Sequence, residues 1–296
     1  MVYIGRKSVG GKTFYYLEQS FRLNGSVQKR EKFLGEAIPK DIAELKRRFS
    51  RDNRAELAYP RLDQIKKGFA ADERSQPASV RKKTHQAFTV RFTYDTNRIE
   101  GSTLSLRETA DLLDRGITPP KRPLADVKEA EAHQEVFRKM LETKKDLSLQ
   151  LVLSWHHGLF LQTEPDIAGS LRDYQVYISG IRYIPPSPVE VYPLLVELFE
   201  WYQSNRKDLH PVELAAVLHL KFESIHPFGD GNGRIGRLMM NFVLHRSGWP
   251  MLNIPYEKRM GYYSALERSQ RKRDEDPFIQ WFFRRYLKEN DRYRVR

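Results

Sequence analysis

The sequence predicts a mainly α-helical protein with a small β-meander at its N-terminus. Three observations favour this fold class. Apolar residues recur at helical spacing over most of the chain beyond residue 77, helix-start signals precede several of these segments, and β-forming residues are concentrated in the first 35 positions. With 296 residues, 40% of them hydrophobic, the chain is long enough for one large domain or two small ones with a real core.

Residues 1–75 are expected to form a basic extension of strands followed by helix. The β-forming segments Val2–Ile4, Thr13–Leu17 and Val27–Leu34 are separated by the turn signals Gly10-Gly11 and Asn24-Gly25. This pattern predicts an antiparallel meander. From Pro39 to about Ala71 the pattern becomes helical and highly charged. The polar stretch Asp72–Pro77 predicts a hinge before a second domain, residues 76–296.

Helix signals continue through the second domain. An apolar stripe extends from Val80 to Ile99, and Ser105 with Glu108 predicts a capping box for a helix closed by Gly116. Further helices are predicted from about Val127 to Leu141, from Ser148 to Leu159, from Ser187-Pro188, and from Pro211 to His226. One segment breaks the run. Residues 174–184, with Ser179-Gly180 at the centre and Pro185-Pro186 after it, predict a β-hairpin.

Charge is distributed unevenly. The formal net charge is +13, and residues 1–85 hold 20 basic against 10 acidic residues, so +10 lies there. This asymmetry indicates a polyanionic partner, such as nucleic acid, or an ordinary solvated face. The absence of cysteine excludes disulfides and thiolate chemistry and fits a cytoplasmic protein. No apolar run reaches membrane-spanning length, and the first residues lack a signal peptide, so no membrane association is expected.

The stretch from His226 to Arg237, HPFGDGNGRIGR, concentrates the reactive groups of the chain. Ile235, Leu238, Met239 and Phe242 recur at the spacing of one apolar helix face, which predicts that the second half of this stretch begins a helix. Gly231, Asn232 and Gly233 therefore stand at a helix N-terminus, where free N–H groups favour an anion. Arg234 and Arg237 can bind further phosphates, Asp230 is suited to Mg²⁺, and His226 can accept a hydroxyl proton.

Other interpretations of this stretch account for less of it. Gly231 to Gly236 matches the dinucleotide-binding fingerprint, but a helix and not a strand precedes it. Asp230-Gly231-Asn232 begins like a calcium loop, but Arg234 stands where a ligand is needed. A hairpin turn conflicts with the helical periods on both sides. A purely structural loop remains the alternative for any single residue, although it accounts poorly for the whole set.

These residues resemble the signature of the Fic family, HxFx(D/E)GNGRxxR, at every fixed position. The similarity extends more loosely over roughly residues 80–285. The resemblance implies an all-α core with a β-hairpin flap, and transfer of AMP from MgATP to a Ser, Thr or Tyr hydroxyl of a protein. It implies that His226 is the general base, that Asp230 holds Mg²⁺, that Gly231, Asn232 and Gly233 form the anion hole, and that Arg234 and Arg237 bind the outer phosphates.

The same resemblance suggests further contacts. Tyr262 and Tyr263 resemble an aromatic pair at the adenine, with helix packing as the alternative, and Gln270 stands where relatives have an Asn. Gly180, Ile181, Arg182 and Tyr183 lie at the expected flap tip. His156, His157 and His219 lie in apolar helices, where structural histidines are more frequent than ligands.

A second motif lies upstream of the signature. Residues 96–101, TNRIEG, resemble the family's inhibitory (S/T)xxxE(G/N) helix. The resemblance implies that Glu100 pairs with Arg237 and blocks productive ATP binding.

We therefore expect an auto-inhibited protein adenylyltransferase, a nucleotidyltransferase that uses MgATP. Two alternatives stay open: de-adenylylation at the same site, and a nucleic-acid-binding regulator acting through residues 1–85. The expected partners are ATP and a target protein with a hydroxyl acceptor. Self-modification is open, as is a homodimer formed through a helical surface near the inhibitory segment.

Overall fold

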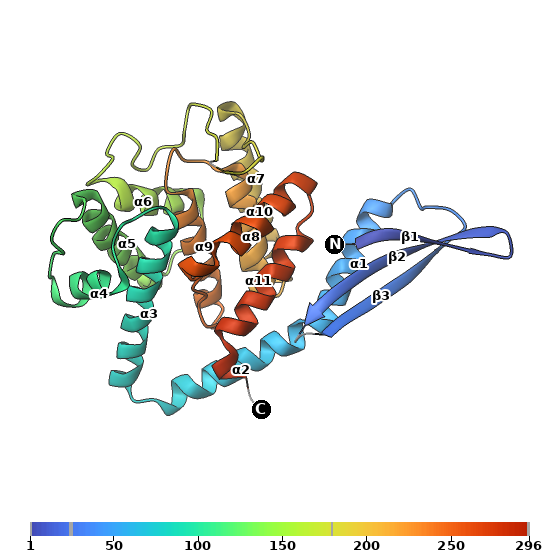
Figure 1. Ribbon diagram of the computed structural model, residues 1–296, viewed down its shortest axis with the longest axis horizontal. Coiled ribbons are helices and arrows are strands. Elements are labelled where there is room, and N and C mark those ends of the chain that lie inside the picture. The colour runs from blue at the N-terminus through green and yellow to red at the C-terminus, as the bar shows by residue number, and fades with distance from the viewer. Residues whose placement is uncertain (1, 24–25, 179, 295–296) are drawn as a thin grey trace.

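The computed structural model describes residues 2–23, 26–178 and 180–294 and confirms the predicted fold class. A helical body carries, on one side, an arm made of three strands and a helix (Figure 1). No described helix is long and apolar enough to cross a membrane. The polypeptide leaves the arm through a helix that passes below the body, whereas the strands of the arm project away from it (Figure 1).

The arm contains the predicted meander. Strands β1 (Val2–Val9), β2 (Lys12–Leu23) and β3 (Ser26–Gly35) pair antiparallel in the order β1-β2-β3. Gly10 and Gly11 make the first turn with φ of 57° and 79°, a left-handed conformation that glycine adopts without strain. The second predicted turn, Asn24-Gly25, lies outside the described residues.

Two helices follow the sheet. Helix α1 (Ile42–Leu57) buries Phe49 against Val2 and Leu17 of the sheet, and α2 (Tyr59–Ser75) leads to the body. Helix α2 continues through Asp72–Ser75, so the interruption is shorter than the polar composition predicts. Only Gln76 and Pro77 separate α2 from α3, because Pro77 suits the entry to a new helix and not the interior of an existing one. The proposed division at residues 75/76 remains a prediction.

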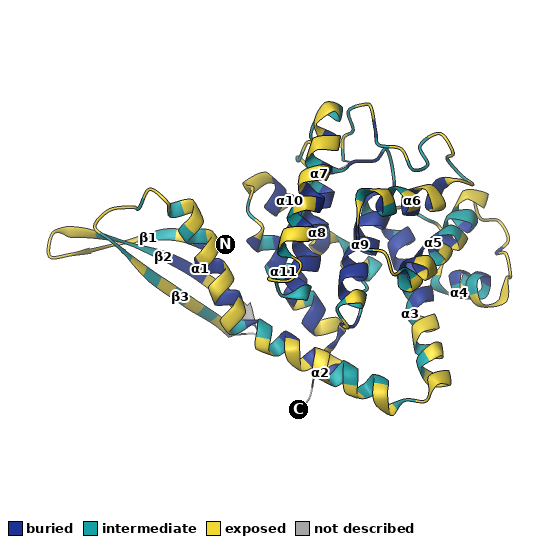
Figure 2. Ribbon diagram, turned by 180° about the vertical axis from the view of Figure 1, so that it is seen from behind, coloured by how far each residue is buried: buried dark blue, intermediate teal, exposed yellow. Residues whose placement is uncertain are grey.

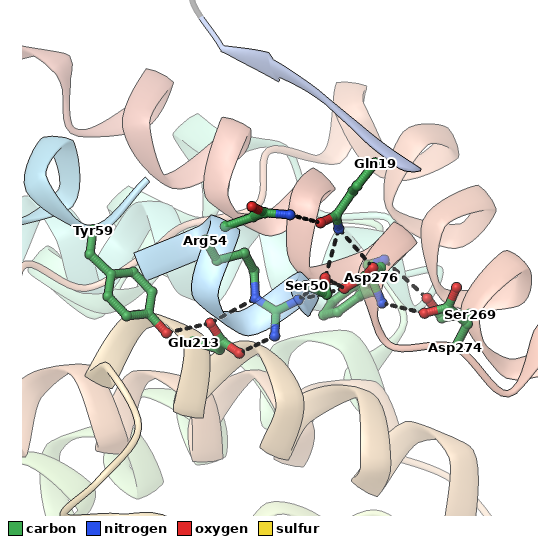
Figure 3. A network of polar contacts seen from close by, with 10 residues as sticks. Gln19, Ser50, Arg54, Tyr59, Glu213, Ser269, Asp274 and Asp276 are labelled. Carbon is green, nitrogen blue, oxygen red and sulfur yellow. Dashed lines mark hydrogen bonds and ion pairs between the residues drawn. The ribbon is translucent and has the colours of Figure 1, made fainter. Parts of the chain in front are cut away.

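A buried polar network joins the arm to the body (Figure 3). Arg54 of α1 donates from Nε and Nη2 to Glu213 of the body, at 2.9 and 2.6 Å, and from Nη1 to Asp276. Burial opposes the charge of Arg54, but Glu213 and Asp276 raise its pKa above the ordinary value. Gln19 of β2 donates to Asp276 at 3.0 Å. These contacts give the arm a defined seat on the body.

The body consists of α3 and the helices that follow it. Helices α8 and α9 are buried on nearly all sides and form its centre, as the dark ribbons of Figure 2 show. The predicted capping box at Ser105–Glu108 is present, the helix predicted at Ser187 also begins with a capping box, formed with Glu190, and Gly116 closes α4 in a left-handed conformation. The elements are α3 (Ala78–Ile99), α4 (Leu106–Arg115), α5 (Leu124–Glu142), α6 (Leu149–Phe160), α7 (Pro188–Asn205), α8 (Pro211–Ile225), α9 (Asn232–Arg246), η1 (Tyr256–Lys258), α10 (Arg259–Lys272), α11 (Asp276–Glu289) and η2 (Asp291–Tyr293).

The prediction of a β-hairpin at residues 174–184 is wrong for the part of this segment that the structure describes, which contains no strand. Hydrogen bonds from side chains hold the segment in place, where a hairpin would have a ladder of backbone hydrogen bonds. Arg172 donates to the carbonyls of Tyr174 and Pro186, at 3.0 and 2.6 Å, and Gln175 donates to Pro185 at 3.1 Å. Neither Pro185 nor Pro186 has an N–H to continue a ladder. Ser179, at the centre of the predicted turn, lies outside the described residues.

Candidate active site

The candidate site lies where α8 ends and α9 begins. His226 follows α8 with φ 52° and ψ 60°, a left-handed conformation that is uncommon for a residue with a side chain. The Asn232 side chain closes the loop by accepting from Phe228 N and donating to Phe228 O, both at 2.9 Å. The amide of Asn232 thus shapes the loop.

His226 is positioned by two buried side chains that the sequence analysis does not predict. Arg172, 4% exposed, donates from Nε to the His226 carbonyl at 2.8 Å. Glu223, one turn earlier on α8, places its Oε2 3.7 Å from His226 Nδ1, an ion-pair distance and longer than a hydrogen bond. Burial opposes ionisation of Glu223, but His226, His219 and Arg237 together lower its pKa. A glutamate three residues before the signature histidine is the one signal that could have revealed this contact.

The packing of α8 against α9 depends on a glycine. A Cβ on Gly236 would lie 2.9 Å from both Glu223 Oε1 and His219 Nδ1, closer than side chains tolerate. A side chain at this position would therefore push the two helices apart. Gly236 lets α9 approach α8 closely at the point where Glu223 and His219 lie.

The inhibitory carboxylate lies directly against the first turn of α9. A Cβ on Gly233 would be 2.1 Å from Glu100 Oε1, so only glycine leaves room for this oxygen. Gly231 precedes the helix with φ 77°, which glycine also adopts readily. A negative group therefore already occupies the helix N-terminus, where backbone N–H groups and the dipole favour one.

Arg237 holds that carboxylate. Its Nη2 donates to Glu100 Oε1 at 2.6 Å, and its Nε donates to Thr96 Oγ1 at 2.6 Å. Arg237 is 1% exposed. Burial opposes its charge, while the neighbouring Glu100 raises its pKa above the ordinary value. The contact implied by the family resemblance, Glu100 on Arg237, is present, and Thr96 of the same motif supports it.

Arg234 lies among carboxylates on the other side of the helix start. It pairs with Glu129 of α5 and, at 3.0 Å, with Asp230, and its guanidinium lies 4.6 Å from the centre of the Phe160 ring. Arg234 is 2% exposed. Burial, Asp230 and Glu129 together raise the pKa of Glu164 nearby. No local pattern predicts Glu129 at this position, because it comes from a helix about 100 positions earlier in the chain.

The residues around Asp230 fit a magnesium ion that is bound mainly through phosphates. The Asp230 side chain is 48% exposed, and its Oδ1 accepts from the Gly231 N–H at 2.5 Å. No group of three or more metal-ligating side chains occurs among residues 2–23, 26–178 and 180–294. One accessible carboxylate with no protein cage is the arrangement expected when Mg²⁺ arrives with a nucleotide.

The side chains predicted to contact the nucleotide base are mostly buried. Tyr262 is 1% exposed and its hydroxyl makes a 2.8 Å hydrogen bond with His219, which corresponds to the helix-packing alternative. Tyr263 is half-buried and donates to the Ile99 carbonyl at 3.1 Å. Gln270 is buried and donates to the Glu223 carbonyl at 3.2 Å. All three lie on α10 beside α8, but only Tyr263 offers partly exposed ring surface.

The expected flap tip contacts α10 and α8. Arg182 N donates to Glu267 Oε1 at 3.1 Å, and the Tyr183 hydroxyl donates to the Ser224 carbonyl at 2.8 Å. Burial raises the pKa of Tyr183. Gly180 has φ 77°, and Ile181 N donates to Ile178 O at 3.4 Å. The segment thus lies beside the end of α8 that leads to His226, although it is not a ladder of strands.

Two further histidines, His156 and His219, are buried and structural. His156 accepts from Gly169 N at 2.9 Å through Nδ1, so its Nε2 carries the proton and donates to Asp230 O at 3.1 Å. Burial lowers the pKa of His156 to about 4. Burial also lowers the pKa of His219. Both rings are neutral near pH 7 and position the loop and α10.

Comparison with known proteins identifies a Fic domain in this chain. Residues 146–244 match the model of the Fic/DOC family. The chain is 33% identical over 231 residues to the Drosophila melanogaster protein adenylyltransferase Fic, covering 74% of this chain and 44% of that protein. It is 34% identical over 181 residues to protein adenylyltransferase fic-1 of Caenorhabditis elegans, covering 59% of this chain and 35% of that protein. The chain thus spans less than half the length of these curated relatives.

Solved structures agree. Fic-1 from C. elegans superposes with a TM-score of 0.72 at 26% identity, covering 86% of this chain and 76% of that chain. A Fic domain-containing signaling protein from Bacteroides thetaiotaomicron gives 0.71 at 28% identity, covering 78% and 95%. The helical core and the loop from His226 to Arg237 define a Fic-domain protein. Residues 146–244 of this chain form a domain of the Fic/DOC family.

Proposed function

We propose that this protein transfers AMP from MgATP to a hydroxyl side chain of a protein and that Glu100 restrains this activity. The chain's relatives are named protein adenylyltransferases, and the loop after His226 carries the groups that such a transfer needs. The observation that carries the proposal is the Glu100 carboxylate, 2.6 Å from Arg237 and against the first turn of α9. An anion of the protein lies where a phosphate of the substrate would bind.

The chemistry follows from the placement of the groups. The acceptor hydroxyl would lose its proton to His226 as its oxygen bonds to the α-phosphorus, while the bond to the β-phosphate oxygen breaks and pyrophosphate leaves. His226 Nδ1 is buried beside Glu223, so Nε2 is the nitrogen available to the acceptor. Mg²⁺, bound with the nucleotide at Asp230, would neutralise phosphate charge. Such transfers depend mainly on positioning and electrostatics.

The phosphates would use donors that are now occupied or unpartnered. Arg237 Nη1 is buried and has no hydrogen-bond partner in the described part of the chain. Together with the N–H groups of the first turn of α9, it can receive phosphate oxygens once Glu100 leaves. Arg234, which Glu129 and Asp230 hold in place, would contribute positive charge beside the phosphates.

The test is incorporation of label from ATP labelled in the α-phosphate, with the full chain as enzyme and as its own acceptor. We expect Glu100→Gly to incorporate label well above the wild type, and Glu100→Gly with His226→Ala to incorporate none. Parallel incubations with UTP, GTP and CTP, read as mass shifts of the intact protein, identify the base. An unlabelled Glu100→Gly protein that nonetheless binds MgATP would refute transferase activity and leave de-adenylylation, tested with an adenylylated target.

A second candidate function concerns the basic arm. A cavity of about 950 Å³ lies between α1, α8 and the end of α10. Basic residues outnumber carboxylates in its lining, which includes Lys46, Arg47, Arg51, Lys272 and Arg273 together with Glu44, Glu213, Asp274, Glu275 and Asp276. None of these five basic residues makes an ion pair with a described residue. Such a groove favours a polyanion such as nucleic acid. We propose that it binds nucleic acid in the cytoplasm, and a binding curve with a steep salt dependence, lost in Arg47→Glu with Arg51→Glu, would support this.

A further inference from the structure

A buried carboxylate on α3 has no part in the transfer reaction described above. Asp95 is fully buried, one residue before Thr96 and five before Glu100. Its Oδ2 accepts from Arg91 Nε at 2.7 Å and from Asn253 Nδ2 at 2.6 Å, and its Oδ1 accepts from Tyr256 N at 2.9 Å. Two of these three donors lie between α9 and α10. Asp95 therefore anchors α3 to the segment that leads into α10.

The same segment holds the end of α3 at two further points. The Arg98 guanidinium lies 5.0 Å from the centre of the Tyr256 ring. Tyr263 donates to the carbonyl of Ile99 at 3.1 Å, immediately before the inhibitory glutamate. The last two turns of α3 are thus attached to residues 253–263 by a carboxylate, a ring contact and a backbone carbonyl.

The geometry of the helix separates this attachment from the contact with α9. At 100° per residue, Asp95 and Glu100 point in directions about 140° apart. Asp95 faces the segment before α10, whereas Thr96 and Glu100 reach Arg237. Contacts on two sides prevent the end of the helix from rotating or sliding. The ion pair of the flexible Glu100 side chain with Arg237 would not prevent this by itself.

We propose that Asp95 is the positioning residue that holds the inhibitory helix in register, so that Glu100 reaches Arg237. This inference rests on the proposed inhibition by Glu100 and extends it: the strength of inhibition is set at a buried anchor outside the nucleotide site. Because Tyr256 and Tyr263 belong to the same attachment, a displacement of α10 releases α3, and a displacement of α3 releases α10.

The substitution Asp95→Asn tests the anchor. The amide has nearly the same shape, but it carries no charge, and its NH₂ group must face either Tyr256 N or the Arg91 and Asn253 donors, so at least one charge-assisted bond is lost. A bond of this kind changes an equilibrium by about tenfold or more. We therefore expect the position in which Glu100 contacts Arg237 to be disfavoured by about tenfold in the variant.

The measurement is the affinity for MgATP by calorimetry in the His226→Ala background, where no turnover occurs. We expect Asp95→Asn to tighten binding by about tenfold toward the value of Glu100→Gly, and to add nothing once Glu100 is replaced by glycine. In proteins with His226 intact, Asp95→Asn should raise incorporation of label from ATP. Asn253→Ala, which removes one donor, gives the same effect in weaker form and serves if Asp95→Asn folds poorly.

Glu213→Gln is the matched control. It also replaces a buried carboxylate by its amide, but in the network that seats the arm. It should lower the melting temperature without changing MgATP affinity. The anchor proposal is overturned if Asp95→Asn and Asn253→Ala leave the affinity at the level of this control while Glu100→Gly tightens it. If Glu100→Gly itself leaves the affinity unchanged, the proposed inhibition fails, and the anchor proposal fails with it.

Discussion

Removing the inhibitory carboxylate should weaken the free protein and, at the same time, make nucleotide a strong stabiliser. In Glu100→Ala the guanidinium of Arg237, 1% exposed, loses its only carboxylate partner among the described residues. Breaking one side of a buried ion pair costs about 3–5 kcal/mol. The lower end applies, because the Glu100 side chain is 27% exposed and Arg237 keeps its hydrogen bonds to Thr96.

The expected loss in the free energy of unfolding is therefore about 3 kcal/mol, which lowers the melting temperature by roughly 6–12 °C for a chain of this size. A non-hydrolysable ATP analogue with Mg²⁺ at 100 times its Kd should return about 2.7 kcal/mol to the variant. The wild type should gain much less, because the nucleotide must first displace Glu100.

The assay is thermal and urea unfolding of both proteins with and without the analogue, with Glu142→Ala as control, since the Glu142 side chain is exposed and distant in sequence from the site. Two results would refute the reasoning. One is a Glu100→Ala protein as stable as the wild type without nucleotide. The other is an equal nucleotide-induced shift in both proteins, which would mean that Glu100 does not compete with the phosphates.

Three further predictions follow from buried groups. Burial, Arg234 and Arg237 lower the pKa of His133 to about 3, so on acidification the unfolded chain binds a proton that the folded chain does not. Lowering the pH from 7 to 5 should therefore reduce the free energy of unfolding by about 2 kcal/mol through this site. Urea unfolding of His133→Gln should show a smaller reduction over the same pH range. Gly233→Ala should destabilise the wild-type protein more than it destabilises the Glu100→Gly variant, because the nearest atoms that the added methyl group meets belong to Glu100 and Arg237. Equal destabilisation of the two proteins in a double-mutant cycle would contradict this. Arg54→Met should cost about 3–5 kcal/mol and expose the arm to limited proteolysis, since two carboxylates lose their partner; an unchanged digestion pattern would argue against this seat for the arm.

Much of the local structure could be read from the sequence because its causes are local. The caps at Ser105 and Ser187, the turn at Gly10-Gly11 and the helix that begins after Gly231 each depend on residues within one or two turns of one another. The hairpin prediction at residues 174–184 failed for the opposite reason. Its β-forming residues are present, but Arg172 and Gln175 hold the segment through contacts that no periodicity reveals.

The sequence by itself determined the helical class of the fold, the chemical inventory of the loop from His226 to Arg237, and the presence of a candidate inhibitory glutamate upstream. The tertiary structure decided which groups surround that inventory: Glu129 on Arg234, Glu223 beside His226, and Asp95 anchoring the helix that carries Glu100. A buried charge requires a partner, but the partner can come from any part of the chain, and only the packing of the helices selects it.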